Sequence, residues 1–275
     1  MLNLKSVFLA LAAAIPCVAL AQPSVVLDSN AKAYKPGQQL SAQSAVNLKV
    51  GERLTLITES GGGVELVGPY SGPVSVPNSG AVKGGQADAK AIVPVNKESQ
   101  KQLQTLVQRL TAQKAVETSA LGVIRQPLAL VTENFTRDLQ GVLSEIPIGL
   151  NGKFCVHTQD LNKVGERFKP RFKSLDEQRS PNSLLMLKAA KGQYVQLSSR
   201  GDQFGWDWPD SLPVKTGQRY LLREDKVSIP YVIELVAVNL PQNANTMYAG
   251  AVLGAKGCSW QAEALSVLNA SAGGR

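Results

Sequence analysis

Two cysteines, Cys155 and Cys258, constrain the fold of this chain more than any other feature. The third cysteine, Cys17, lies in an N-terminal segment with the pattern of a cleaved signal peptide, so an even pair remains in the mature chain. An even pair in an oxidising compartment predicts a disulfide, and two buried free thiols are the alternative. With His157 as the one histidine, the chain offers too few soft ligands for a closed zinc site.

Residues 1–21 have the features of a secretory signal peptide. Lys5 provides a short positive region, an apolar stretch runs from Val7 to Leu20, and Ala19-Leu20-Ala21 is a small-x-small cleavage pattern. We expect cleavage before Gln22 and a periplasmic or secreted product. The apolar stretch falls short of the roughly 20 residues that span a bilayer, so we expect no stable membrane insertion after cleavage.

The formal net charge of +8 would attract acidic proteins or anionic envelope polymers. The densest basic stretch runs from Lys163 to Arg179 and is interrupted by acidic residues. We interpret it as a solvated face and expect no nucleic-acid partner. The alternative is a surface that binds an anionic polymer, with an affinity that falls steeply as salt rises.

Residues 22–77 have the alternating pattern of a small β domain. In the segment 45–58, apolar side chains occupy every second position on either side of a Gly51-Glu52 turn: Val46, Leu48 and Val50 before it, and Leu54 and Leu56 after it. Ser60-Gly61-Gly62-Gly63 predicts a hairpin turn, because β-prone residues follow it, whereas a phosphate-binding glycine loop opens a helix. The run 68–73, GPYSGP, is expected to end the next strand.

Four consecutive features carry a resemblance to a known family. They are Tyr34-Lys35-Pro36-Gly37-Gln38-Gln39-Leu40, the alternating strand Val46–Val50, the glycine turn 60–63, and Val64-Glu65-Leu66-Val67-Gly68-Pro69. This order resembles the FecR-type domain of secreted and periplasmic bacterial proteins, over about residues 25–76. The turn departs from the family, which has an acidic residue before its glycine. The resemblance implies a small β domain used in sensing or in protein contacts at the envelope, without catalytic residues.

The middle of the chain predicts a linker and then a helix. Residues 78–95 are poor in large apolar side chains, which is typical of a flexible connection. The segment 96–144 is expected to hold a helix capped by Asn96, followed by a connector. One face of that helix is apolar, with Leu103, Leu106, Val107 and Leu110 at helical spacing. We expect this face to pack on a β domain. A coiled-coil dimer is the alternative, and the oligomeric state stays open.

Residues 145–275 are expected to form a second, disulfide-tied α+β domain. The predicted strands are rich in β-branched and aromatic residues: 154–156, 184–188, 194–198, 220–222 and 231–238. The tail then predicts a helical hairpin, with a first helix capped by Asn245 or Thr246 and stopped by Gly254 and Gly257, and a second starting at Ser259. The disulfide would tie this hairpin to the strand that holds Cys155. The fold class is therefore α+β: a β domain, a central amphipathic helix and a β-rich domain.

The segment 205–213, GWDWPDSLP, is the strongest candidate for a ligand or partner platform. In an extended segment Trp206 and Trp208 point to the same side and Asp207 to the other, and paired indoles suit sugar stacking or cation capture. The competing interpretation is that the indoles fill the core, since aromatic residues make up only 5% of the chain. We favour the core interpretation.

Catalytic signatures are sparse in the sequence. His157 would need a free thiolate or a serine elbow beside it, and the predicted disulfide removes Cys155 as a nucleophile. No cofactor or metal motif stands out. We therefore expect an exported, non-enzymatic accessory or sensing module that binds a protein or an envelope polymer. The alternative is a cell-wall glycan hydrolase or transferase, with Asp207 or Asp210 as the acid and a tryptophan platform for the sugar.

Overall fold

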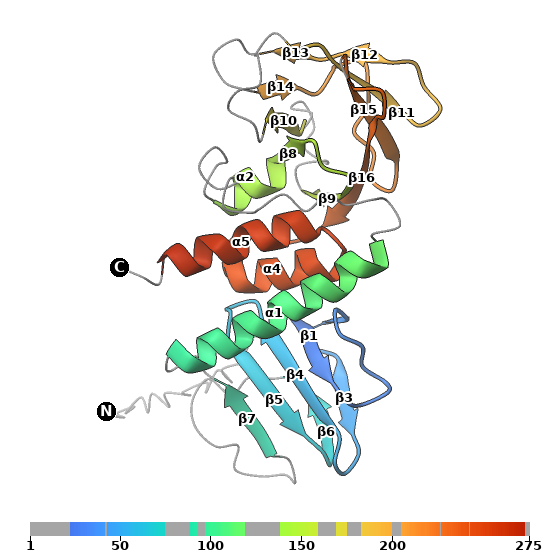
Figure 1. The fold of residues 1–275 in the computed structure, drawn as a ribbon. Helices are drawn as coiled ribbons and strands as arrows, with labels where there is room; N and C mark the ends of the chain where they lie inside the picture. The colour runs from blue at the N-terminus through green and yellow to red at the C-terminus, as the bar shows by residue number, and fades with distance from the viewer. Residues whose placement is uncertain are drawn as a thin grey trace, which may run out of the picture.

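The computed structural model describes residues 23–41, 43–74, 88–92, 97–118, 138–158, 169–174, 183–199, 205–225, 227–241 and 243–272. Helices α1, α4 and α5 lie as a layer across the middle of the molecule, between an N-terminal β region and a C-terminal β-rich region (Figure 1). The predicted α+β class and the Cys155–Cys258 disulfide are confirmed. The predicted signal peptide lies outside the described residues.

The N-terminal region consists of a five-stranded antiparallel sheet and a two-stranded ribbon. In spatial order the sheet contains β2 (Gln39–Leu40), β1 (Ser24–Ser29), β4 (Arg53–Thr58), β5 (Gly63–Val67) and β7 (Asp88–Ile92). The ribbon pairs β3 (Ala45–Leu48) with β6 (Tyr70–Pro73). The alternation predicted for 45–58 buries its apolar positions in one core: Val46, Leu48, Leu54 and Leu56. These strands form because one face of each can be removed from water.

One detail predicted for this region is wrong. The alternation predicts a buried strand position at Val50, but β3 ends at Leu48 and Val50 is 82% exposed. The chain already turns there, because the backbone N–H of Glu52 donates to the carbonyl of Lys49 (3.0 Å). The run 68–73 follows the end of β5 at Val67, as predicted, and its last four residues form a further strand, β6, because they pair with β3.

The glycine turn joins β4 to β5 as a hairpin, as predicted. Gly61 has a φ of +83°, and its N–H donates to the carbonyl of Thr58 (2.8 Å). A side chain at Gly61 would overlap Asn245, the residue that caps α4. The backbone N–H of Asn245 also donates to the carbonyl of Glu59 (3.2 Å). The turn therefore needs glycine for its conformation and for its close contact with a helix far along the chain.

The flexible connection predicted for 78–95 is wrong for residues 88–92. They form β7, which pairs antiparallel with β5 along its whole length, from Val67↔Asp88 to Gly63↔Ile92. The sequence does not predict this strand, because its apolar residues are mostly small and its partner residues lie 21 to 29 positions earlier in the chain. The rest of that segment lies outside the described residues.

Helix α1 (Lys97–Thr118) confirms the predicted amphipathic helix. Leu103, Val107 and Leu110 are 1–2% exposed, and Leu106 is partly buried against the same core. This face packs on α4, α5 and β1 within the same chain. The surface proposed for a coiled-coil dimer is therefore already covered. The predicted cap, Asn96, lies outside the described residues.

Helices α4 (Thr246–Ala255) and α5 (Ser259–Ala272) confirm the predicted C-terminal hairpin. The side chain of Asn245 accepts from the N–H of Met247 (2.8 Å), and Gly257 follows the end of α4 with a φ of +82°. Gly254 does not stop the helix, contrary to the prediction. It lies inside α4, where a Cβ would come within 2.6 Å of Thr111 Oγ1 on α1, so glycine allows the two helices to approach.

The C-terminal region contains two sheets that share a core with Phe154, Phe172, Tyr220 and Leu235 among its members. One sheet contains, in spatial order, β12 (Val195–Gln196), β11 (Leu185–Ala189), β15 (Arg219–Glu224), β16 (Tyr231–Val238) and β9 (Gly152–His157). The other contains β13 (Ser198–Ser199), β14 (Gly205–Asp207), β10 (Arg171–Ser174) and β8 (Glu145–Ile148). The pairs β9–β16 and β8–β10 are parallel, and the other pairs are antiparallel. A short helix, α2 (Leu139–Ser144), precedes β8.

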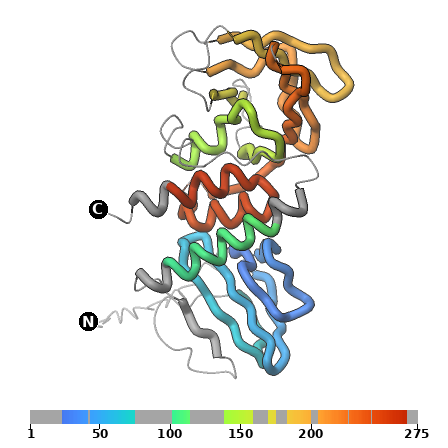
Figure 2. The backbone as a smooth tube through the Cα atoms, viewed as in Figure 1, coloured from blue at the N-terminus to red at the C-terminus, as the bar shows by residue number. Residues whose placement is uncertain are grey.

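A single apolar core joins the helix layer to both β regions. Val25 and Ile57 of the N-terminal sheet, Cys155 of β9 and Val238 of β16 belong to the same buried cluster as the inward residues of α1, α4 and α5. The backbone tube in Figure 2 shows α4 and α5 lying between the two regions although they come last in the sequence. The hairpin assigned to 145–275 thus also packs on the sheet of the first region.

Candidate functional site

Trp206 and Trp208 both lie in the core of the C-terminal region, at 1% and 2% exposed. Trp206 sits on β14 opposite Phe172 of β10. Trp208 stacks on the ring of Phe172 (centroids 5.6 Å apart, planes at 11°) and meets Tyr220 edge to face (4.8 Å, 80°). Its indole N–H donates to the carbonyl of Leu212 (2.7 Å). Both indoles are packed in the core, so the structure supports the core interpretation.

The two aspartates of this segment occupy different environments. Asp207 is half-buried on β14. Asp210 is exposed, in the turn that follows, and forms an ion pair with Lys169. Because both indoles are buried, a sugar bound near Asp207 or Asp210 would lack the aromatic platform that the hydrolase alternative requires.

His157 has a structural partner at the end of β9. Its Nε2 donates to the carbonyl of Leu240 at 2.5 Å, and the side chain is 7% exposed. Since a carbonyl can only accept, the proton resides on Nε2. Cys155, two residues earlier, is bonded to Cys258, so no thiolate lies beside the imidazole.

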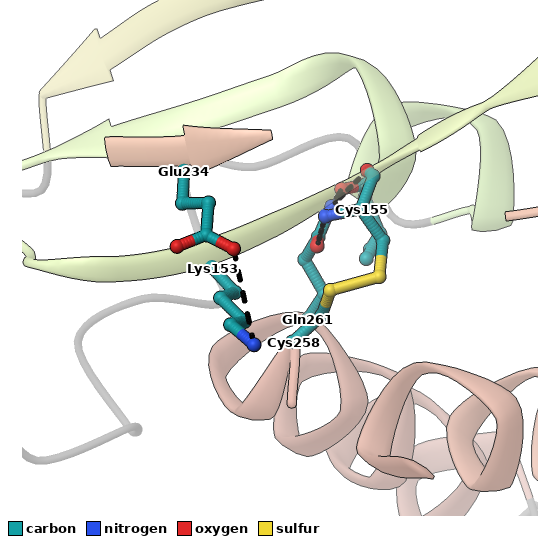
Figure 3. The surroundings of a disulfide bond; sticks show 6 residues. Lys153, Cys155, Glu234, Cys258 and Gln261 are labelled. Atoms are coloured by element: carbon teal, nitrogen blue, oxygen red, sulfur yellow. Dashed lines mark hydrogen bonds and ion pairs between the residues drawn. A yellow bond between two sulfur atoms is a disulfide. The ribbon is translucent and has the colours of Figure 1, made fainter. Parts of the chain in front are cut away.

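The disulfide joins β9 to the short connection between α4 and α5 (Figure 3). Cys155 and Cys258 are fully buried, with their Cα atoms 5.8 Å apart. Close by, Glu234 of β16 contacts Lys153 (3.9 Å) and Arg219 (3.5 Å) across three neighbouring strands. The Cys155–Cys258 disulfide is the structural link predicted from the sequence.

Gln261 of α5 completes the unpaired side of β9. Its Oε1 accepts from the N–H of Cys155 (2.5 Å), and its Nε2 donates to the carbonyls of Cys155 (2.9 Å) and Val142 (2.7 Å). The side chain amide thus replaces the missing neighbouring strand at this position, and it is 1% exposed. Nothing in the sequence pattern marked this residue, because its role depends on where α5 docks.

The predicted basic surface is only partly described, and much of its charge there is paired. Of the stretch Lys163 to Arg179, the structure describes residues 169–174. Lys169 pairs with Asp210, and Lys173 lies 3.5 Å from Glu145. The described part therefore contributes little free positive charge.

A cleft of about 760 Å³ lies at the far end of the N-terminal region, where β1 and β3 end and β4 and β6 begin. We call it the distal cleft, because β4 runs from it to the turn that touches α4. Its lining comes from three separate segments of the chain: Asn30, Lys32, Ala33, Asn47, Leu48, Lys49, Glu52, Pro69, Tyr70 and Ser71.

Hydrogen bonds hold the walls of the distal cleft in place. The Asn30 side chain accepts from the N–H of Arg53 (2.6 Å) and donates to the carbonyl of Gly51 (3.1 Å). The Glu52 carboxylate accepts from the N–H of Lys49 (2.7 Å). A Cβ at Gly68 would overlap the carbonyl of Lys49, so the turn before β6 lies directly against the turn before β4. The cleft is therefore formed before any ligand arrives.

The charge of the distal cleft is positive. Lys32 and Lys49 line it with exposed side chains, and neither has an ion-pair partner among the described residues. Glu52 is the one acidic residue of the lining, and the backbone already uses one of its oxygens. Two unpaired ammonium groups at a preformed recess favour an anionic ligand.

The distal cleft is not predicted by the sequence pattern. Gly51-Glu52 and Gly68-Pro69 are recognisable turn signals in the sequence. In an antiparallel hairpin, the turns before and after the paired strands could be expected at the same end of the sheet. What the sequence lacks is the register that places Asn47 opposite Ser71 and Leu48 opposite Tyr70.

Metals, membranes and known relatives give no further indication of function. Within the described ranges, no group of three or more His, Cys, Asp or Glu side chains is placed to hold a metal ion. No helix in the part of the chain that the structure describes is long and apolar enough to cross a membrane. A scan of protein-family models, a search of curated proteins and a search of solved structures each gave no match to this chain.

Proposed function

We propose that this chain is an exported, non-enzymatic binding module of the Gram-negative envelope, which recognises a protein or an envelope polymer through the distal cleft. The observation that carries the proposal is the cleft itself, a preformed recess in which Lys32 and Lys49 have no ion-pair partner among the described residues. Charged groups left unpaired in a rigid recess are available to a ligand.

Two features support the export part of the proposal. The disulfide uses both cysteines that follow the predicted signal peptide, Cys155 and Cys258, as expected in an oxidising compartment. The FecR-type resemblance of residues 25–76 covers all the residues that line the distal cleft. That family uses its small β domain for sensing and for protein contacts, which agrees with a binding role.

The hydrolase alternative gains no support from the side chains it needs. Trp206 and Trp208 are buried, Asp210 is paired with Lys169, and His157 donates to a backbone carbonyl. Each of these groups has a structural role in the arrangement described above.

Fractionation of a Gram-negative host that expresses the full chain tests the export part. We expect the protein in the periplasmic fraction, with an N-terminus at Gln22 by mass spectrometry and without titratable thiols in the native state. Unprocessed chain in the cytosol, or two reactive thiols, would contradict it.

Sedimentation with isolated envelope tests the binding part. We expect the mature protein to co-sediment with purified envelope material, and a Lys32→Glu/Lys49→Glu variant to remain in the supernatant with an unchanged melting temperature. Equal sedimentation of the variant would exclude the distal cleft as the binding site. Release of soluble fragments from purified peptidoglycan that stops in Asp210→Asn would instead support the hydrolase.

A further inference from the structure

The distal cleft presents free hydrogen-bond donors. Its acceptors are largely used within the protein: Oδ1 of Asn30 accepts from Arg53, Oδ1 of Asn47 accepts from Ser71 Oγ (2.7 Å), and Glu52 accepts from Lys49. The amide N–H₂ group of Asn47 has no partner among the described residues, nor do the ammonium groups of the two lysines. The cleft therefore fits a ligand rich in acceptor oxygens.

The rest of the lining offers an apolar surface next to these donors. Pro69 is exposed and Tyr70 is half-buried, and both line the distal cleft. The Tyr70 hydroxyl donates to the carbonyl of Pro73 (2.7 Å), which fixes the ring. An aromatic or proline ring beside polar groups suits the apolar face of a sugar ring, while the sugar oxygens meet the donors.

We infer that the distal cleft binds an acidic glycan, a chain of sugar rings that carries carboxylates; this inference rests on the proposed function and names its ligand class. The carboxylates pair with Lys32 and Lys49, and ring and hydroxyl oxygens accept from the Asn47 amide. The volume of about 760 Å³ lies within the range of roughly 300–1,000 Å³ that is typical of ligand clefts, which is room for more than one sugar ring.

Other anionic partners fit the cleft less well. An acidic peptide presents a backbone N–H at almost every residue, whereas Oδ1 of Asn30, Oδ1 of Asn47 and one oxygen of Glu52 already accept hydrogen bonds within the walls of the cleft. A nucleic acid would need more cations along its backbone than Lys32 and Lys49 provide.

Calorimetric titration of the mature chain with short oligomers tests the inference. The probes are a hexamer of galacturonic acid, a neutral hexasaccharide of glucose, and hexaglutamate as an acidic peptide of equal length. We expect the galacturonate oligomer to bind most tightly and its affinity to fall as salt rises, because exposed charge pairs are screened.

Lysine variants locate the site. We expect Lys32→Ala and Lys49→Ala each to weaken galacturonate binding about threefold, and the double variant about tenfold, as exposed charge pairs allow. Lys191→Ala is the matched control, because Lys191 is an exposed turn lysine between β11 and β12, and it should leave binding unchanged. All variants should keep the wild-type melting temperature, since neither ammonium group has a partner within the described structure.

Three results would overturn the inference. They are undetectable galacturonate binding, hexaglutamate binding as tight as galacturonate binding, and a double variant that binds like the wild type. None of these results would contradict co-sedimentation of the wild type with envelope that is lost in Lys32→Glu/Lys49→Glu. The glycan inference can therefore fail while the binding-module proposal stands.

Discussion

Replacing Gln261 with leucine should be the most destabilising change of similar size in the helix layer. The substitution keeps an apolar stem in a site that is 1% exposed, but it removes the partners of three buried backbone groups: the N–H and carbonyl of Cys155 and the carbonyl of Val142. A buried polar group left without a partner costs about 1–3 kcal/mol. Because the surrounding structure relaxes in part, the summed cost of the three groups should lie near the low end of this range. We therefore expect a loss of about 3–5 kcal/mol in the free energy of unfolding.

The assay is equilibrium urea unfolding of the oxidised mature protein, followed by circular dichroism and tryptophan fluorescence. Gln104→Leu is the matched control, because Gln104 on α1 is half-buried and makes one long hydrogen bond to the carbonyl of Ser266 (3.4 Å). It should lose less than about 1 kcal/mol. If Gln261→Leu is no less stable than Gln104→Leu, the amide of Gln261 does not complete the edge of β9, and the explanation given for this residue fails.

Three further predictions concern the links between elements. Cys155→Ala/Cys258→Ala should lower the free energy of unfolding by on the order of 4 kcal/mol, because the disulfide closes a loop with a sequence separation of 103. Urea unfolding with and without reductant measures this loss, and reductant should not change the unfolding curve of the variant. Gly51→Ala should lose about 1 kcal/mol for its left-handed φ alone, and Gly61→Ala clearly more, since Gly51 has open space and Gly61 faces Asn245; equal melting temperatures would contradict this. Burial and the nearby Glu59 raise the pKa of Tyr248 to about 12. The neutral phenol should therefore contribute its whole stabilisation below pH 10, and the free energy of unfolding should fall by on the order of 2 kcal/mol as the pH rises towards 12. In thermal melts at successive pH values, Tyr248→Phe should reduce this alkaline loss of stability.

The sequence predicted those parts of the fold that repeat along the chain. Period-two alternation identified the strands around Leu54 and Leu56, and helical spacing identified the buried face of α1, because burial of one face leaves a periodic trace. Val50 follows the same alternation and is exposed, because a local hydrogen bond between Glu52 and Lys49 turns the chain first. A period shows where a strand can form but not where it stops.

Features that depend on distant partners were not visible in the sequence. β7 consists largely of small and charged residues, and only its pairing with β5 makes it a strand. The tryptophan pair was assigned to the core on the scarcity of aromatic residues, and the packing of Trp208 on Phe172 and Tyr220 supplies the physical reason. The distal cleft depends on three chain segments that come together in the right register and on which oxygens already accept hydrogen bonds, and neither can be obtained from the order of residues alone.

The position of the last two helices explains how a ligand at the distal cleft would relate to the rest of the molecule. The strand β4 carries six residues, and at about 3.3 Å per residue it separates the cleft from the helix layer by roughly 20 Å. At its other end, Glu59 and Gly61 contact Asn245, the cap of α4, and the connection after α4 is bonded through Cys258 to β9. The cleft therefore lies at the free end of a sheet whose opposite end is fixed by backbone contacts and a covalent bond. A large polymer can reach it without contacting the C-terminal region. Because α4 and α5 share one core with both β regions, the sheet that holds the ligand is packed rigidly against the disulfide-tied region and is not joined to it by a linker alone.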